Sequence, residues 1–374
     1  MRLTISSTTL ASRLTALSKV FNSKNSLPIL DCYLFEVNSN QLTITASDSE
    51  NVMTTQIQLD ESDGNGTFAV NNRNILDAVK ELPEQPLTLD VDMSTYAIKI
   101  IYMNGMYNFT AQSGDEFPRM QPLNDSAAAI TIESKTLAND IAHSIFATAN
   151  EELRPVMNGI YFDLKEDSLA IVASDGHKLV RTLNKNIKSE KPMSFILPKK
   201  PATLLKNVLQ KTEDDVIIRF DDRNANILFP EGTLACRLIE GRYPNYNSVI
   251  PQDNPNLLTV DRMVLASVVR RVLPFASDSS QQIRLHIETG KAVISSEDID
   301  FYTSAKEEIV CDYNGMPMDI GFKGTSLMEI LTNLDGEEVE LKLADPSRPC
   351  LIIPTNQPEN EDVLMLIMPM LLND

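Results

Sequence analysis

The sequence predicts an α+β protein that consists of three homologous repeats, each built from sheets and helices. The first observation is a strand that ends in a polar motif and occurs three times, in residues 42–48, 169–175 and 292–298. The first two copies end in Ala-Ser-Asp, and the third is a weaker copy that ends in Ser-Glu-Asp. Similarity that recurs at a fixed period of roughly 120 residues indicates a repeat architecture.

Two further patterns keep the same register along the chain. Each repeat opens with a short alternating strand that leads into a leucine-containing helix, in residues 3–12, 130–137 and 258–267. Each repeat continues with a second strand and helix, in residues 68–82, 195–209 and 320–331. We therefore expect each repeat to contain two halves, and each half to run from a strand through a helix into several strands.

The first repeat shows these elements in order. Residues 1–5 alternate as a strand does, and Leu10, Leu14, Leu17 and Phe21 then follow at helical spacing. A second helix is expected at residues 72–82. The remaining expected strands lie at residues 33–37, 42–46, 68–70, 87–91, 97–102 and 107–111. Helices with one apolar side bury that side against the sheets and leave the other side exposed.

Polar segments that contain proline separate the repeats. Residues 121–129 read Gln-Pro-Leu-Asn-Asp-Ser-Ala-Ala-Ala, and residues 251–256 read Pro-Gln-Asp-Asn-Pro-Asn. Both compositions are typical of linkers. The 374 residues therefore divide into three predicted domains, at residues 1–124, 125–253 and 254–374.

The composition argues against several classes of protein. The cysteines Cys32, Cys236, Cys311 and Cys350 are far apart and form no Cys-x-x-Cys pair, so neither a disulfide framework nor a zinc site is indicated. No apolar run approaches the ~20 residues that span a bilayer, and Met1 leads into the first strand without a targeting segment. We expect a soluble, cytoplasmic protein with no cofactor and no membrane partner.

The net charge of −19 argues against nucleic-acid binding, but the basic residues are unevenly distributed. Residues 1–30 contain four basic residues and no acidic one, and residues 191–211 contain five basic residues and no acidic one. A third predicted helix carries Arg262, Arg270 and Arg271. A single basic helix face is most often ordinary solvated surface. Its recurrence in several repeats instead favours a functional basic surface on the helices. Such a surface can keep its positive potential on an acidic protein because salt screens the distant negative charges.

The order of several short motifs carries a family resemblance. The motifs are Leu-Pro-Ile-Leu at 27–30, Met-Asn-Gly at 157–159, Ser-Asp-Gly-His-Lys-Leu at 174–179, Glu-Gly-Arg-Tyr-Pro-Asn-Tyr at 240–246, Val-Ile-Pro at 249–251 and Ile-Met-Pro-Met at 367–370. Over essentially the full length, the sequence resembles the bacterial DNA polymerase III beta subunit family, the replicative sliding clamps. The resemblance implies the DNA clamp fold and a head-to-tail homodimeric ring, with inner helices around duplex DNA and outer sheets.

The resemblance also accounts for the charge. A closed ring is held on DNA by topology, so weak contacts that ignore base sequence are sufficient and permit sliding. Such a ring confers processivity because it tethers the polymerase to its template. By position in the resemblance, the DNA-facing candidates are Lys24, Arg73, Lys199 and Lys200, with Lys206, Arg13 and Lys19 as weaker candidates.

A second implied site is a peptide-binding groove between the second and third domains. Its expected partners are the DNA polymerase III catalytic subunit, the clamp loader, and other polymerases and repair proteins that carry clamp-binding peptides. The apolar residues 365–372 can instead be read as the last buried strand, and we expect a mixture of the two roles. The implied groove residues are Met157, Ser174, Gly176, His177, Lys178, Leu179, Pro244, Val249, Pro349, Leu366, Ile367, Met368, Pro369, Met370 and Leu372.

Two positions depart from the family pattern at this groove. Lys178 stands where arginine is common, so a planar bidentate contact would be lost. Leu371 stands where a basic residue commonly follows Met-Pro-Met, so the groove rim would be more apolar. Both changes are expected to alter the preferred peptide.

The dimer contact would join the first domain of one protomer to the third domain of its partner. Exposed sheet edges can pair across such a contact, and the candidates are residues 96–108 with Leu273 and Phe275. Phe275 can equally be ordinary core.

An enzymatic interpretation starts from Ser174, Asp175 and His177, which are close in sequence. A catalytic triad is defined by geometry, and these residue types at a strand end more often build a turn. His143 and His286 lie in helix and strand patterns with structural roles, and no phosphate loop or metal-ligand spacing occurs. We expect a non-catalytic subunit of a DNA-directed DNA polymerase. The alternatives are a hydrolase that uses Ser174 and His177, and an acidic scaffold that does not bind DNA.

Overall fold

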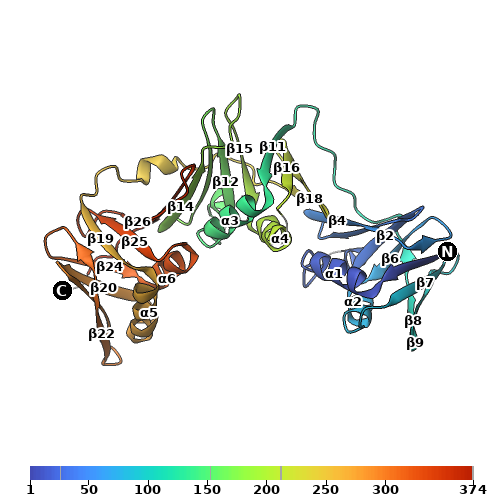
Figure 1. Cartoon of the computed structure of the whole chain (residues 1–374), viewed down its shortest axis with the longest axis horizontal. Helices are drawn as coiled ribbons and strands as arrows, with labels where there is room; N and C mark the ends of the chain where they lie inside the picture. Colours follow the sequence, from blue (N-terminus) through green and yellow to red (C-terminus); the bar gives the residue numbers. More distant parts are fainter. Residues whose placement is uncertain (26, 152, 211–212, 373–374) are drawn as a thin grey trace. The chain divides into compact units, whose positions relative to one another are not determined.

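The computed structural model describes residues 1–25, 27–151, 153–210 and 213–372 (Figure 1). Its internal contacts define two compact units. The first compact unit combines Met1–Ala138 with Lys200–Leu238, and the second combines Asn139–Lys199 with Ile239–Asp374. The central repeat therefore contributes residues to both units.

The first compact unit contains two sheets of antiparallel neighbours. The smaller sheet has the order β5 (Glu61–Ser62), β1 (Arg2–Ser6), β7 (Pro86–Asp92), β8 (Ala97–Tyr102), β9 (Gly105–Thr110). The larger sheet has the order β10 (Gln112–Ser113), β6 (Gly66–Asn71), β2 (Cys32–Asn38), β3 (Gln41–Ser47), β4 (Asn51–Gln58), β18 (Gly232–Arg237), β17 (Asn224–Phe229), β16 (Asp215–Phe220), β11 (Ala128–Glu133).

The second compact unit has the same organisation. Its larger sheet has the order β15 (Met193–Pro198), β12 (Gly159–Leu164), β13 (Leu169–Ser174), β14 (Lys178–Asn184), β27 (Glu361–Ile367), β26 (Cys350–Pro354), β25 (Glu338–Leu343), β19 (Asn256–Asp261), β23 (Asp312–Tyr313). Its smaller sheet has the order β22 (Thr303–Val310), β21 (Lys291–Asp298), β20 (Gln282–Glu288), β24 (Met318–Lys323).

In the described ranges, α-helices occur where the periodicity predicts them, two in each repeat. The α-helices are α1 (Ser7–Ser18), α2 (Asn72–Val79), α3 (Ser134–Ile145), α4 (Lys199–Leu209), α5 (Arg262–Val272) and α6 (Gly324–Asn333). The short 3-10 helices are η1 (Pro28–Asp31), η2 (Pro155–Met157), η3 (Tyr246–Val249) and η4 (Leu273–Phe275). In the first compact unit α1 and α2 pack against each other, with α1 on β3 and β4 and α2 on β6 (Figure 1).

The first strand and helix show how the sequence directs this packing. Leu3 and Ile5 alternate into the core along β1, and Ser6 then caps α1, because its hydroxyl accepts a hydrogen bond from the Thr9 N–H at 3.2 Å. Leu10, Leu14 and Leu17 occupy one face of α1 and are fully buried. Helix α1 ends at Ser18, so the expectation that Phe21 continues the helix was wrong, and Phe21 lies in the segment that follows the helix.

One strand that was not predicted from the sequence joins the first two repeats. β4 pairs with β18, which makes a single nine-stranded sheet from strands of both repeats. Gly232 lies opposite Thr55 and tolerates no Cβ atom, because a Cβ there would collide with the carbonyl oxygen of Thr54. The Thr55 hydroxyl donates a hydrogen bond to the Glu231 carbonyl at 2.7 Å. A pairing of β14 with β27 joins the central and third repeats in the same way.

Asp140 on α3 is a buried carboxyl whose Oδ2 atom has no hydrogen-bond partner among the described residues. Its burial, and secondarily the charge of Glu361, raises the pKa of Asp140 well above the usual value. The folded protein thus retains a proton that the unfolded chain releases above about pH 4. Stability is therefore lost as the pH rises from that value toward the raised pKa.

We expect Asp140→Asn to stabilise the protein by about 1–2 kcal/mol at pH 8 and to have little effect near pH 4, since the amide has no charge to bury. Chemical denaturation of both proteins at the two pH values measures the difference. Asp77→Asn, which removes an exposed carboxylate from an ion pair with Lys80 on α2, is the control and should not stabilise the protein. If Asp140→Asn stabilises the protein equally at both pH values, ionisation of Asp140 is not the cause of the stabilisation.

No helix in the described parts of the chain is long and apolar enough to cross a membrane. Within those same parts, no three His, Cys, Asp or Glu side chains are grouped closely enough to bind a metal ion.

Candidate functional site

An apolar cavity of about 330 Å³ lies in the second compact unit. It is formed where the turn after β13, the segment around η3 and the end of β27 meet, and we call it the groove. Its lining residues are Arg154, Met157, Ser174, Gly176, His177, Lys178, Leu179, Tyr243, Pro244, Asn245, Tyr246, Val249, Leu366 and Met368.

The turn between β13 and β14 is held by backbone hydrogen bonds from its polar side chains. The Ser174 hydroxyl donates to the Lys178 carbonyl at 2.9 Å and accepts from the Gly176 N–H at 3.1 Å. The Asp175 Oδ1 atom accepts from the N–H groups of His177 and Lys178, at 2.8 and 2.9 Å. Gly176 has φ +89°, a left-handed conformation that favours glycine. These residues build a turn, which argues against a Ser174–His177 hydrolase site.

Lys178 is buried beside the groove and is engaged within the protein. Its ammonium lies 2.6 Å from Asp175 Oδ2 and 3.2 Å from Glu329 Oε2 on α6. Burial alone would favour the neutral form of each partner, but the ion pair overrides burial, so the pKa of Lys178 is raised and that of Asp175 is lowered. Lys178 therefore attaches the turn to α6.

Apolar side chains and a set of tyrosines complete the groove. The Met368 N–H donates to the His177 carbonyl at 2.8 Å, which fixes the end of β27 against the turn. Met368 and Val249 remain 37% and 49% exposed, so apolar surface is open to a ligand. Tyr161 stacks on Tyr243 with ring centroids 4.6 Å apart, and the Tyr246 hydroxyl donates to Asp163 at 2.7 Å. These contacts hold the aromatic wall in place.

The structure brings together most of the residues that were predicted for the groove. The predicted residues that line the cavity are Met157, Ser174, Gly176, His177, Lys178, Leu179, Pro244, Val249, Leu366 and Met368. The predicted residues outside its lining are Pro349, Ile367, Pro369, Met370 and Leu372.

The residues after Met368 turn away to the smaller sheet, which explains why Pro369, Met370 and Leu372 lie outside the lining. Ile367 faces the core and is 1% exposed, and Met370 forms a bridge to Gly321 of β24, with its N–H donating to the Gly321 carbonyl at 2.8 Å. The lining residues that were not predicted are Arg154, Tyr243, Asn245 and Tyr246. The last three lie in the motif at residues 240–246, so the motif itself was the available signal; nothing in the sequence marked Arg154.

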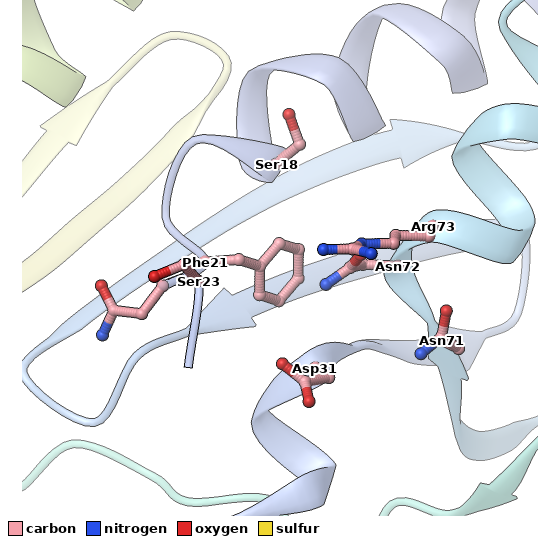
Figure 2. Close-up of a pocket in the computed structure, with 8 residues that line it drawn as sticks. Ser18, Phe21, Ser23, Asp31, Asn71, Asn72 and Arg73 are labelled. Carbon is pink, nitrogen blue, oxygen red and sulfur yellow. The ribbon is translucent and has the colours of Figure 1, made fainter. Parts of the chain in front are cut away.

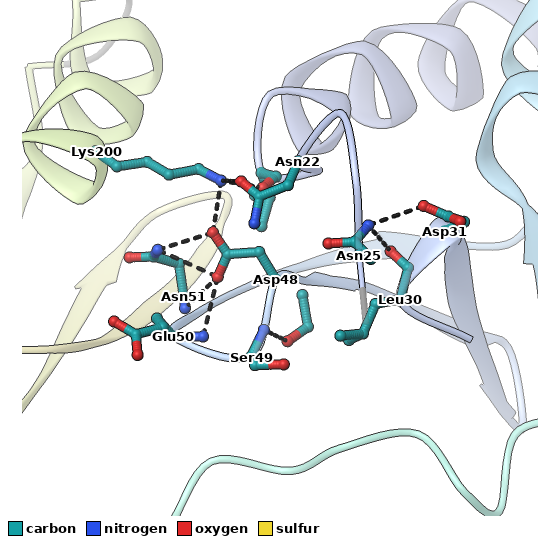
Figure 3. A network of polar contacts seen from close by, with 11 residues as sticks. Asn22, Asn25, Leu30, Asp31, Asp48, Ser49, Glu50, Asn51 and Lys200 are labelled. Carbon is teal, nitrogen blue, oxygen red and sulfur yellow. Dashed lines mark hydrogen bonds and ion pairs between the residues drawn. The ribbon is translucent and has the colours of Figure 1, made fainter. Parts of the chain in front are cut away.

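Lys200, one of the predicted DNA-facing residues, is committed to contacts inside the first compact unit (Figure 3). Its ammonium donates to the Val20 carbonyl at 2.5 Å, to Asn22 Oδ1 at 2.7 Å and to Asp48 Oδ2 at 2.5 Å. An ammonium has three hydrogens, so these three acceptors use all of them. In this structure Lys200 therefore joins α4 to the first repeat, and its predicted contact with DNA, which would compete with these internal contacts, stays a prediction.

Asp48 explains why this contact forms. Its side chain is almost completely buried, and its Oδ1 atom accepts hydrogen bonds from the N–H groups of Glu50 and Asn51, at 3.0 and 2.7 Å (Figure 3). Burial would raise the pKa of Asp48, but the hydrogen bonds from Lys200 and Asn51 outweigh burial and lower the pKa. A buried carboxylate without such a partner would be strongly destabilising.

The other predicted DNA-facing residues differ in their partners. Among the described residues, none forms a hydrogen bond or ion pair with the side chains of Lys24, Arg73 or Lys206. The Lys199 ammonium donates to Asn150 Oδ1 at 3.2 Å, and the weaker candidate Arg13 forms an ion pair with Glu231. Lys24, Arg73 and Lys206 thus keep their charges available to solvent or a ligand.

Comparison with protein families gives three matches that follow one another along the chain. Residues 1–121 match the DNA polymerase III beta subunit N-terminal domain, residues 131–245 its central domain, and residues 247–371 its C-terminal domain. This chain belongs to the DNA polymerase III beta subunit family. The three-domain clamp fold that the family resemblance implied is thereby confirmed.

Named relatives and solved structures agree with this assignment. The chain is 27% identical to the beta sliding clamp of Pseudomonas putida KT2440 over 373 residues, which covers 99% of this chain and 100% of the relative. It is 24% identical to the Bacillus subtilis beta sliding clamp over 384 residues, with 99% of each chain covered. The crystal structure of the Thermotoga maritima DNA polymerase III beta subunit superposes with TM-score 0.90 at 27% identity, over 100% of each chain.

The crystal structure of the Pseudomonas aeruginosa clamp bound to griselimycin superposes with TM-score 0.93 at 24% identity, over 100% of each chain. Membership of the DNA polymerase III beta subunit family establishes the protein as a sliding clamp for DNA polymerase III. It acts as a processivity factor in DNA replication and is not itself an enzyme.

Proposed function

We propose that two copies of the chain close head to tail into a ring around duplex DNA, with helices inside and sheets outside. Each protomer contributes three domains, at residues 1–124, 125–253 and 254–374, and the ring works in the cytoplasm. The observation that carries this proposal is a pair of unpaired sheet edges, β9 in the first repeat and β22 in the third. An edge strand offers unpaired N–H and C=O groups to another chain.

Apolar residues near these edges support a contact between protomers. Met103 and Met106, at the turn between β8 and β9, are 79% and 58% exposed. Phe275 is 40% exposed, so the alternative that it is ordinary core is not supported, while Leu273 packs partly against the core of the third repeat. Exposed apolar groups of this kind gain stability when a partner covers them. We propose that β9 of one protomer meets β22 of its partner, because a head-to-tail contact that repeats twice closes a ring.

We propose that Lys24, Arg73 and Lys206 supply weak, sequence-independent contacts to DNA phosphates. Each carries a charge with no partner among the described residues. A few such contacts give modest affinity that falls with salt, which suits a ring that has to slide.

We propose that the groove binds short peptides from the DNA polymerase III catalytic subunit, the clamp loader, and other polymerases and repair proteins. Its lining is mostly apolar, and its walls are fixed by the turn at residues 174–178 and by the tyrosine stack. A preformed apolar cavity with few polar groups is typical of ligand sites. Methionine at its edge adapts to different apolar side chains, which favours several partners.

The test of the ring is retention on DNA. The protein is loaded onto nicked circular DNA by its clamp loader with ATP, and the circle is then cut. We expect retention on the circle and release after cutting, because only topology holds the ring, and sedimentation should give the mass of a dimer. Equal binding to circular and linear DNA would contradict the ring and indicate direct surface binding. No binding to either form would favour the acidic-scaffold alternative.

A further inference from the structure

The first repeat contains a second cavity, of about 500 Å³, of whose lining the proposed function uses only Arg73 (Figure 2). It lies between the end of α1, the loop that follows, η1 and the start of α2. Its volume falls within the range of small-ligand sites. Its lining residues are Ser18, Phe21, Asn22, Ser23, Asp31, Asn71, Asn72 and Arg73.

An aromatic ring forms one wall of this cavity. Phe21 is half-buried and packs edge-on against Tyr33, with ring centroids 5.0 Å apart and planes at 72°. Tyr33 is itself fully buried and donates from its hydroxyl to the Leu14 carbonyl at 2.7 Å. Phe21 is therefore held by a fixed neighbour while part of its surface lines the cavity. Aromatic rings in such positions stack on nucleic-acid bases.

A carboxylate and a guanidinium lie around the same space (Figure 2). Asp31 Oδ1 accepts a hydrogen bond from Asn25 at 2.8 Å, while no described residue donates to Asp31 Oδ2. Arg73 lies in the first turn of α2 and has no partner among the described residues. A guanidinium binds phosphate in a bidentate manner, and the start of a helix adds favourable partial positive charge.

We propose that this cavity binds one nucleotide, with the base on Phe21, the exocyclic amino group of the base at Asp31 and the phosphate at Arg73. The three groups match the three parts of a nucleotide. A carboxylate accepts hydrogen bonds from the amino group of cytosine, whereas thymine presents a carbonyl and a methyl group at the corresponding edge. The site therefore prefers cytosine over thymine. This selectivity goes beyond the base-independent contacts of a sliding ring and does not depend on ring closure.

The first experiment is a calorimetric titration of the full chain with dCMP and with dTMP. We expect saturable binding of dCMP and at least a fivefold weaker affinity for dTMP, because one good base contact accounts for that much discrimination. Asp31→Asn should abolish the preference, since an amide can donate to thymine as well as accept from cytosine. Arg73→Met should weaken binding of dCMP and leave binding of deoxycytidine, which lacks the phosphate, unchanged.

Phe21→Leu should weaken binding of both nucleotides by at least fivefold, because it removes the stacking surface. Phe301→Leu, which alters a 77% exposed aromatic side chain in the third repeat, is the control and should bind as the original protein does. Asp31→Asn keeps the shape of its side chain, so it tests the proposal even where Phe21→Leu disturbs folding. Absence of saturable binding, equal affinity for dCMP and dTMP, or unchanged preference in Asp31→Asn would overturn the proposal.

The source of the nucleotide is distinguished by a second titration, with primed duplexes that carry single-stranded dC or dT overhangs. Tighter binding of the dC overhang than of dCMP, abolished in Asp31→Asn, would assign the cavity to an unpaired nucleotide of DNA. Binding of dCMP without a difference between the overhangs would assign it to a free nucleotide.

Discussion

Lys200→Met is expected to destabilise the first compact unit by about 2–3 kcal/mol, because it removes the charged partner of the buried Asp48 and leaves that carboxylate unpaired. The value lies below the upper range for buried pairs because the Lys200 side chain is 33% exposed and partly solvated. Chemical denaturation monitored by hydrogen exchange at residues 45–55 measures the effect.

Lys206→Met is the matched control, because Lys206 lies on the same helix and has no partner among the described residues. It should leave the free energy of unfolding unchanged. It should also reduce the salt dependence of DNA retention: the slope of log retention against log salt concentration should fall by about one for each phosphate that the side chain no longer neutralises. The double variant Asp48→Asn/Lys200→Met should recover part of the stability, since the unpaired charge is gone. A loss of DNA retention in Lys200→Met without a loss of stability would contradict the structural role of Lys200.

The pH dependence of this contact has a defined sign. The folded-state pKa of Asp48 is lowered, so the contribution of the carboxylate is fully present above its unfolded value of about 3.9 and is lost as the pH falls through the folded value. The stability difference between the original protein and Lys200→Met should therefore narrow below about pH 4.

Met368→Asp is expected to lower the affinity of the groove for a clamp-binding peptide of the polymerase catalytic subunit by at least about 30-fold. The substitution replaces an apolar wall of the groove with a charge that a bound peptide would desolvate, and such central positions account for about 2 kcal/mol or more of binding. Fluorescence polarisation with a labelled peptide measures the affinity.

Two controls show whether the effect belongs to the groove. Met316→Asp changes a methionine that is 81% exposed elsewhere in the third repeat and should bind peptide normally. Met370→Asp should reduce affinity much less than Met368→Asp, because Met370 lies at the bridge to Gly321 outside the cavity lining. Equal losses for Met370→Asp and Met368→Asp would mean that the peptide site extends along the C-terminal segment, as the family resemblance implies.

The sequence was sufficient to predict the three repeats, the helix positions and many strands. These features depend on local periodicity: Leu10, Leu14 and Leu17 show one buried helix face without any knowledge of the rest of the chain. The strand expected at residues 97–102 coincides with β8 for the same reason. The motif at residues 174–179 also identified the turn that now forms one side of the groove.

Only the tertiary structure could decide which distant segments meet. The pairings of β4 with β18 and of β14 with β27 make continuous sheets from different repeats, and no local pattern encodes a partner more than a hundred residues away. Lys200 shows the same limit for a side chain. Its sequence context is that of an exposed basic helix, but its ammonium reaches a buried carboxylate in another repeat. Periodicity in a sequence determines which side of an element is buried, whereas the partner on that side is determined by the packing of the whole chain.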